Sequence, residues 1–225
     1  MRLKSNLLMS IKSLTFVTLC LVVFQTSFAQ RNYNDYNRVG ITGGVTFFDI
    51  NTSDLVTETG TGFAGGFTTR GAFRNNFDLI YGISFYSSKI GVQGSNGLSN
   101  QAIKYSIQAA QLGFLGSYNI VKHHLSLEFG PILNVNSKMK MDSESFEDYI
   151  LEGYTTLRAK DIEDISRINF RVAGGITGGL ESLRVSAMYQ YGVTNMLGKL
   201  NDKGLENKDF KGNSSTIVVS AVVYF

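Results

Sequence analysis

The sequence predicts an all-β fold, an eight-stranded antiparallel up-and-down β-barrel that spans a membrane. Three observations support this fold: eight segments of alternating apolar and polar residues, long and short connections that alternate between them, and a last strand that ends on an aromatic residue. A period of two is typical of strands whose two faces meet different surroundings. No stretch keeps the 3.6-residue period that an amphipathic helix needs.

The first 29 residues predict a cleaved signal peptide. Basic residues precede an apolar run at 14–24 that is too short to span a bilayer, and Ser27-Phe28-Ala29 has the pattern of a cleavage site. We therefore expect a signal peptide at 1–29, a polar lead-in at 30–37 and a single barrel domain at 38–225.

Cleavage would change the charge and the cysteine content. The chain has 21 Lys and Arg against 18 Asp and Glu, and three of the basic residues lie in the signal peptide. The mature chain is then neutral, which gives no reason to expect a nucleic-acid partner. The only cysteine, Cys20, also leaves, so no disulfide and no Cys-ligated metal is expected.

The alternating segments can be followed in order along the chain. They cover about 38–48, 62–73, 77–88, 103–118, 124–137, 166–179, 183–195 and 213–225. In the fourth segment the apolar residues change phase, from Tyr105 and Ile107 to Leu112 and Phe114. We attribute this change to a β-bulge near Ala109-Ala110.

The connections differ in length according to their position in the order. The first, third, fifth and seventh are long, at about 49–61, 89–102, 138–165 and 196–212, and the others are short, at 74–76, 119–123 and 180–182. Membrane barrels place long loops outside the cell and short turns in the periplasm. An even number of strands then puts both termini on the periplasmic side.

Alternation alone does not separate a membrane barrel from a soluble one, so the polar face decides between them. Lysine is almost absent from the strand interiors, whereas arginine, carboxylates and glycine are common on the face opposite the apolar residues. This composition suits a narrow lumen in which carboxylates hold guanidinium groups. We expect a charged plug of four arginines and two carboxylates, most of it in the short-turn half. Its members are Arg38, Arg70, Asp78, Glu128, Arg171 and Arg184, and Gln108 and Gln190 share the polar face.

Aromatic residues near the strand ends are expected to form two interfacial girdles. The long-loop girdle would contain Phe47, Phe63, Phe85, Tyr105, Phe170 and Tyr191, and the short-turn girdle Phe73, Phe77 and Phe225. Pro131 lies inside a predicted strand and donates no backbone hydrogen bond, so it requires a bulge or a position without a ladder bond.

Three motifs raise the question of catalysis or metal binding. Gly60–Gly65 matches a dinucleotide-binding fingerprint, but no helix follows it, so we interpret it as barrel wall. His123 and His124 are adjacent and are expected to be exposed turn residues. A calcium site is conceivable in the acidic run at 142–152, although a solvated loop is the preferred interpretation. We expect no catalytic residue, no metal and no cofactor, and hence no enzyme.

The chain resembles the PorT-like family of outer-membrane β-barrels of Bacteroidetes. The resemblance rests on Leu127-Glu-Phe-Gly-Pro131, Tyr191-Gly-Val-Thr-Asn195, the strand at 112–118 with its short turn, and the terminal Tyr224-Phe225. It implies the same barrel fold, whereas the functions of the family are diverse. The terminal Phe225 also resembles the signal read by the barrel-insertion machinery.

Taken together, the residues predict a monomer in the cell outer membrane, surrounded by its lipid, with a structural or interaction role through long extracellular loops. The expected protein partner lies outside the cell or in the envelope. The alternatives are a narrow pore for small solutes or ions, an accessory component of a secretion system, and a lipid-modifying enzyme.

Overall fold

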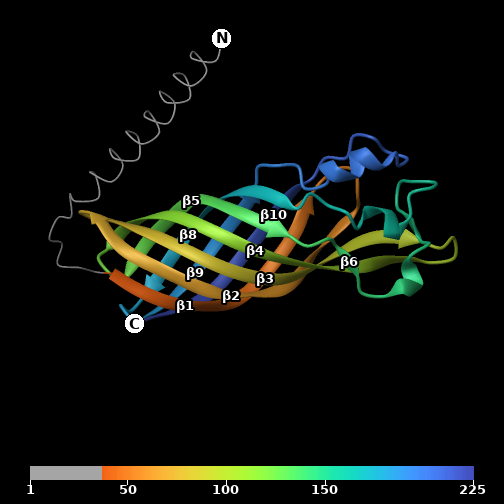
Figure 1. The fold of residues 1–225 in the computed structure, drawn as a ribbon. Helices are drawn as coiled ribbons and strands as arrows, with labels where there is room; N and C mark the ends of the chain where they lie inside the picture. Colours follow the sequence, from red (N-terminus) through yellow and green to blue (C-terminus); the bar gives the residue numbers. More distant parts are fainter. Residues whose placement is uncertain (1–36) are drawn as a thin grey trace, which may run out of the picture. The chain divides into compact units, whose positions relative to one another are not determined.

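The computed structural model describes residues 37–225, so the predicted signal peptide and the lead-in before Asn37 lie outside the described part. Eight long strands form the barrel (Figure 1). They are β1 (Asn37–Asn51), β2 (Thr57–Arg74), β3 (Phe77–Ser95), β4 (Asn100–Val121), β5 (Leu125–Asn136), β8 (Ile168–Gly179), β9 (Leu183–Gly192) and β10 (Asn213–Tyr224). Each strand is antiparallel to its neighbours, and β10 pairs with β1, which closes the barrel. The predicted fold class is confirmed.

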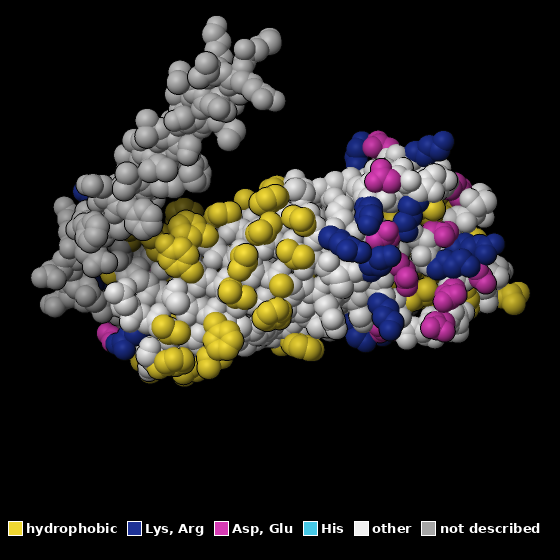
Figure 2. Space-filling model, viewed as in Figure 1, with side chains coloured by type: hydrophobic (Ala, Val, Ile, Leu, Met, Phe, Trp, Pro, Cys, Tyr) yellow, Lys and Arg dark blue, Asp and Glu magenta, His cyan; other side chains and the backbone are white. Residues whose placement is uncertain are grey.

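The two faces of the wall have opposite character. Apolar side chains point outward and remain exposed, whereas many inward positions carry buried polar side chains such as Thr68, Gln111 and Ser186. Figure 2 shows apolar side chains over the barrel wall and charged ones gathered beyond it. A polar interior inside an apolar wall reverses the arrangement of a soluble protein. The wall is therefore built to face lipid.

The fourth strand is where the bulge prediction is wrong. The β3–β4 ladder runs without a register shift from Phe77↔Tyr118 to Ser95↔Asn100. Ile107 points inward and is buried, and Leu112 points outward and is exposed. The inward and outward positions alternate without interruption along β4, but the apolar residues occupy the outward positions at Leu112 and the inward positions at Ile107. Gln108 accordingly lies on the outer face, and Tyr105 is buried rather than part of the girdle.

The connections fall into two classes, and the termini of the barrel lie at its short-turn end (Figure 1). Turns at 75–76, 122–124 and 180–182 are short, as predicted.

At the other end two predicted long loops are tight turns, 52–56 and 96–99, because β2, β3 and β4 extend beyond the barrel. The remaining two are long and contain β6 (Lys140–Met141), β7 (Ile150–Leu151) and the 3₁₀-helices η1 (Glu144–Phe146), η2 (Ala159–Ile162) and η3 (Gly198–Lys203). In the described part of the chain no helix has the length and apolarity to cross a bilayer.

These connections fold together into a loop head, defined here as residues 48–56, 89–107, 137–167 and 193–212. Its centre is an apolar core in which Tyr105, Ile162 and Leu200 are fully buried. The inward apolar residues of β3 and β4 belong to this core, which explains the change of pattern along β4. The other core residues are Phe48, Ile50, Leu55, Ile90, Val92, Ile103, Ile107, Met139, Met141, Leu151, Leu157, Ala159, Ile165, Met196, Leu197 and Phe210.

The first and last strands are also joined above the barrel. The Thr52 hydroxyl donates to the Lys211 carbonyl at 2.5 Å, and the Lys211 amide donates to an Asp54 carboxylate oxygen at 2.7 Å. Residues 52 and 54 follow β1, and residue 211 precedes β10. The junction between β1 and β10 therefore has contacts in the loop head in addition to its own ladder.

Pro131 occupies the position without a ladder bond that the sequence requires. The β4–β5 ladder is interrupted between Gly113↔Ile132 and Gly116↔Phe129, with the same register on both sides. At Gly130 a Cβ would collide with the Phe114 carbonyl oxygen of β4. Glycine at 130 thus permits the close approach, and no bulge is needed for the proline.

Candidate functional site

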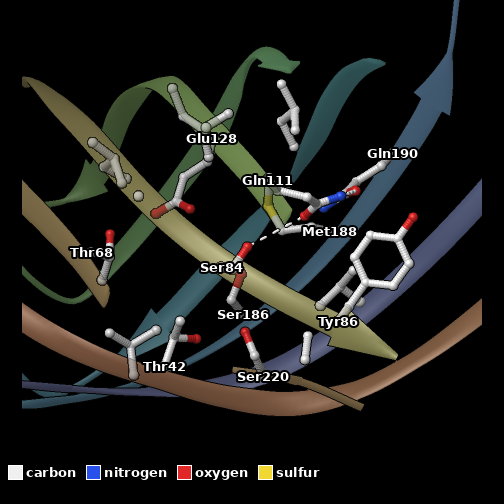
Figure 3. A pocket seen from close by; sticks show the side chains of 18 of the residues that line it. Thr42, Thr68, Ser84, Tyr86, Gln111, Glu128, Ser186, Met188, Gln190 and Ser220 are labelled. Atoms are coloured by element: carbon white, nitrogen blue, oxygen red, sulfur yellow. Dashed lines mark hydrogen bonds between the residues drawn. The ribbon is translucent and has the colours of Figure 1, made fainter. Parts of the chain in front are cut away.

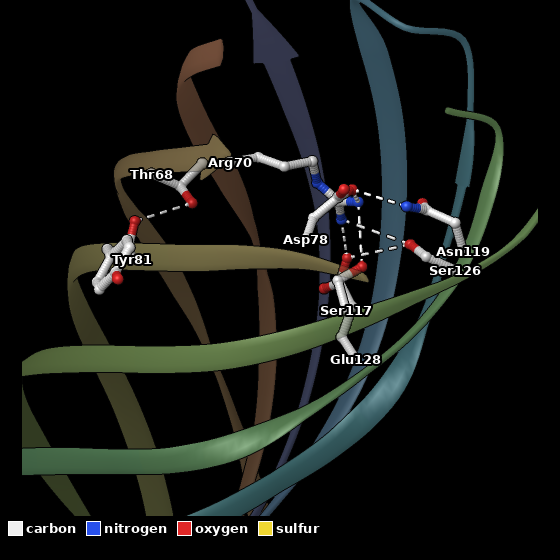
Figure 4. A network of polar contacts seen from close by, with 8 residues as sticks. All are labelled: Thr68, Arg70, Asp78, Tyr81, Ser117, Asn119, Ser126 and Glu128. Carbon is white, nitrogen blue, oxygen red and sulfur yellow. Dashed lines mark hydrogen bonds and ion pairs between the residues drawn. The ribbon is translucent and has the colours of Figure 1, made fainter. Parts of the chain in front are cut away.

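The candidate site is the lumen, and its most strongly charged part lies near the short-turn end. Asp78 on β3, Ser117 on β4 and Glu128 on β5 are direct cross-strand partners, so period-two alternation places all three side chains in one inward row. Arg70 reaches this row from β2. We call Arg70, Asp78, Ser117, Asn119, Ser126 and Glu128 the lower charge layer (Figure 4).

Arg70 is the centre of the lower charge layer. One terminal nitrogen donates to an Asp78 carboxylate oxygen and to the Ser117 hydroxyl, both at 3.1 Å. The other donates to Glu128 and, at 3.4 Å, to the Ser126 hydroxyl. The side chains of Arg70, Asp78 and Glu128 are almost completely buried. One guanidinium is thus paired with two buried carboxylates, so neither of these buried charges lacks an ionic partner.

The other predicted plug residues do not all join this layer. Arg184 is fully buried in the lumen at the short-turn end of β9. Arg38 lies at the rim with its side chain about half exposed, 3.7 Å from Glu181 in the β8–β9 turn. Its predicted place inside the lumen is therefore wrong, because β1 begins at the mouth of the barrel.

Arg171 lies nearer the loop head, in a separate upper polar layer made of Tyr86, Gln111, Arg171, Gln190 and Thr216. Its guanidinium donates to the Tyr86 hydroxyl at 2.8 Å, to Thr216 at 3.3 Å and to Gln190 at 3.4 Å. It also lies over the ring of Phe48, 6.0 Å from the ring centre. Neutral oxygens and aromatic rings hold this arginine, so the expected pairing of four arginines with two carboxylates does not occur.

A cavity of about 140 Å³ lies between the two layers (Figure 3). Hydroxyl groups such as that of Ser84 and apolar side chains such as that of Met188 both line it, and Glu128 borders it from below. The Thr177 hydroxyl also faces this space, is buried, and has no hydrogen-bond partner in the described structure. A cavity of this size with polar groups in its lining has room for several water molecules.

Some lumen residues were not found by sequence reasoning. Ser117 and Ser126 occupy inward positions at period two, and this spacing was the only available signal. Which hydroxyl meets which guanidinium depends on the register between strands. That register is fixed by pairing and not by any single segment.

The weaker sequence motifs lie in the barrel wall, in a short turn and in the loop head. Gly60–Gly65 lies within β2, as predicted. His123 and His124 occupy the β4–β5 turn, and His124 Nδ1 is 2.9 Å from the Gly179 carbonyl oxygen. In the acidic run, Asp142 pairs with Lys89, and Asp148 pairs with Arg158 and Lys160. Within residues 37–225, no three His, Cys, Asp or Glu side chains gather as a metal ligand set.

The geometry defines the class of protein: a closed eight-stranded barrel with an apolar outer wall and a polar interior is a membrane-spanning β-barrel of the outer-membrane type. Solved structures that the chain resembles are Neisserial surface protein A (11% identity, TM-score 0.47), Ail of Yersinia pestis (14%, 0.47) and OprG of Pseudomonas aeruginosa (12%, 0.48). The matches cover 83–84% of this chain and 97%, 99% and 96% of the three others. At these identities and scores the likeness carries no conclusion about function.

No family model matches the chain, and no curated protein matches it. Membership of the PorT-like family therefore stays a prediction. The role of Phe225 as an insertion signal is also untested. Its side chain is exposed at the end of the wall, and its amide donates to the Val39 carbonyl at 2.9 Å.

Proposed function

We propose that the protein is a non-enzymatic outer-membrane barrel that presents the loop head outside the cell as a contact surface. The observation that carries this proposal is the apolar core of the loop head. Solvated loops would not bury such a core, and a folded head keeps a fixed surface for a partner. The termini and short turns would then lie in the periplasm, as is usual for barrels of this class.

The lumen supports a role without transport. The lower charge layer and the upper polar layer both cross the lumen, and the core of the loop head lies beyond them. An ion would have to displace buried arginine contacts at both levels. Opening either layer would expose unpaired charge at a cost of several kcal/mol.

The orientation can be tested by labelling single cysteines in intact cells. The mature chain is expected to have no cysteine, so Leu98→Cys at the β3–β4 tip and Lys122→Cys in a short turn each give one thiol. We expect a membrane-impermeant maleimide to label the residue-98 variant on intact cells and the residue-122 variant only after the outer membrane is opened. The reverse pattern would overturn the proposed orientation.

A narrow pore is the second candidate, and the internal cavity is the observation that favours it. Planar-bilayer recording separates the two candidates. We expect the purified protein to give no steady, discrete conductance steps, and such steps would replace the contact role with transport. An accessory role in secretion rests only on the resemblance to the PorT-like family and remains a prediction.

A further inference from the structure

Three lysine side chains converge on one carboxylate at the base of the loop head. The ammonium groups of Lys138, Lys199 and Lys203 lie 3.7, 3.3 and 3.8 Å from Asp164 oxygens. Lys138 follows β5, Asp164 precedes β8, and the other two lysines lie on η3 after β9. Two connections of the barrel, β5–β8 and β9–β10, thus supply one cluster, which we call the Asp164 cluster.

The Asp164 cluster carries more positive than negative charge. Asp164 is the only ion-pair partner of these three lysines among the described residues, and its side chain is 14% exposed. The neighbouring Glu163 carboxylate is engaged elsewhere, since it accepts the Met141 amide at 3.2 Å. Burial alone would raise the Asp164 pKa, but the adjacent Lys199 ammonium and the charges of Lys138 and Lys203 lower it overall. One ionised carboxylate therefore faces three ammonium groups.

The cluster lies next to the upper edge of the apolar wall. Val135 and Ile168 pair across β5 and β8 and point outward near the loop head, and both are exposed. Lys138 comes three residues after Val135, and Asp164 four residues before Ile168. In Figure 2 charged side chains begin where the apolar wall ends. This level corresponds to the head groups of a bilayer that surrounds the wall.

We propose that Lys138, Lys199 and Lys203 bind the phosphate group of a lipid head group in the leaflet nearest the loop head. Phosphate oxygens accept hydrogen bonds from several ammonium groups at once, and lysine is a common phosphate ligand. Asp164 holds the three long side chains together before the lipid arrives, which lowers the entropy lost on binding. The side chains remain 34–56% exposed, so a head group can reach them. The assignment of this leaflet to the outer surface rests on the proposed function.

Native mass spectrometry of the folded full chain in detergent can test the proposal. The probes are a phosphorylated outer-leaflet glycolipid, the same glycolipid after dephosphorylation, and inorganic phosphate as a competitor. The test variant is K138Q/K199Q/K203Q. The control is K104Q/K122Q/K208Q, which removes the same charge from exposed lysines in three separate places. Heat-modified migration on gels shows whether each variant is folded, and K199Q alone replaces the triple variant if it is not.

We expect the wild-type chain and the control to retain the phosphorylated glycolipid, and the test variant to bind it on the order of tenfold more weakly or worse. The dephosphorylated glycolipid should bind weakly to all three proteins. Equal retention by both triple variants, or equal binding of both glycolipids, would overturn the proposal. Displacement by stoichiometric inorganic phosphate would identify a free-anion site and overturn the lipid assignment. Lipid binding is measured in detergent and does not depend on the orientation of the barrel in the membrane. A negative binding result would therefore contradict the lipid site, whereas a reversed labelling pattern would contradict the proposed orientation.

Discussion

Arg70 on β2 is bonded to Glu128 on β5, although β3 and β4 separate these two strands in the barrel wall. The same guanidinium is bonded to Asp78 on β3. With its bond to Ser117 on β4, one side chain of β2 therefore reaches three other strands. Its removal takes from two buried carboxylates the guanidinium that bonds both of them, which is a larger change than the loss of one ion pair.

This shared arginine determines how variants of the lower charge layer should behave. From the sequence, Arg70→Ala with Asp78→Ala is expected to be milder than Asp78→Ala alone, because both partners leave together. Because Arg70 also bonds Glu128, the double variant takes this partner from a second buried carboxylate, and we now expect it to be less stable than the Asp78→Ala variant. We expect Arg70→Met to cost at least about 3–5 kcal/mol of unfolding free energy. The triple variant with Arg70→Met, Asp78→Asn and Glu128→Gln should recover most of that loss. Urea unfolding in detergent would show this, and a triple variant no more stable than Arg70→Met alone would contradict it.

The hydrogen bond between Tyr86 and Arg171 predicts a second stability effect. Tyr86→Phe removes the hydroxyl that accepts from the guanidinium at 2.8 Å and leaves the ring in place. A hydrogen bond to a charged group contributes about 1.5–3 kcal/mol, so the unfolding free energy should fall by about that amount. Tyr81→Phe is the matched control, because Tyr81 faces outward on the same strand. Equal effects of the two substitutions would mean that the upper polar layer does not stabilise the barrel.

The core of the loop head predicts local rather than global unfolding. Leu200→Ala should destabilise the loop head by about 2–5 kcal/mol, because it deletes a fully buried side chain. Limited proteolysis should then cleave within residues 137–167 and 193–212 while the barrel stays intact. Leu98→Ala is the control, since Leu98 is 95% exposed at a turn tip and should change nothing. Unchanged cleavage of the Leu200→Ala chain would show that the loop head is not held by its core.

Glu206 gives the loop head a dependence on pH. Its carboxylate accepts the Thr156 amide at 2.7 Å and also bonds the Thr155 and Leu157 amides. The hydrogen bond from the Thr156 amide, reinforced by Thr155, lowers the Glu206 pKa from 4.5 to about 2. Because the folded pKa is depressed, the stabilisation is present above pH 4.5 and is lost as the pH falls toward 2. The protection of the amides of residues 155–157 against hydrogen exchange, relative to their intrinsic exchange rate at each pH, should therefore fall in that window.

The control for this prediction is Glu206→Gln, which cannot ionise. We expect fast exchange at residues 155–157 in this variant at neutral pH, with no further change between pH 4.5 and 2 that Glu206 would cause. Retention of the wild-type pH profile in the variant would assign the effect to another carboxylate.

Sequence reasoning succeeded where a local pattern has one physical cause. Alternation at Val219, Ala221 and Val223 identified the lipid-facing side of β10, because a period of two admits only two faces. It failed on β4, where the apolar residues move from the outer to the inner face between Leu112 and Ile107. The pattern changes there because the apolar side chains of one unbroken strand face outward in the wall and inward in the core of the loop head. A sequence pattern cannot distinguish this change from a bulge.

The lumen was predictable in composition but not in its contacts. Inward charges at positions 70, 78 and 128 were identified from the polar face of each strand. The partners of Arg171 were not, because they come from β3, β9 and β10 and depend on several registers together. The core of the loop head was missed for a similar reason. Part of it comes from the ends of β3 and β4, where the apolar residues face inward, and the rest comes from connections that have no period of their own.

The contacts of Thr52 and Asp54 with Lys211 have a consequence for how the barrel could come apart. In an up-and-down barrel, the β1–β10 junction is where the two ends of the wall meet, and lateral parting would begin there. Both contacts lie directly above this junction, and Phe48 on one side and Phe210 on the other pack into the same core. For β1 and β10 to separate, these contacts in the loop head must break first. The lifetime of the closed barrel is therefore set in part by structure that lies outside the bilayer.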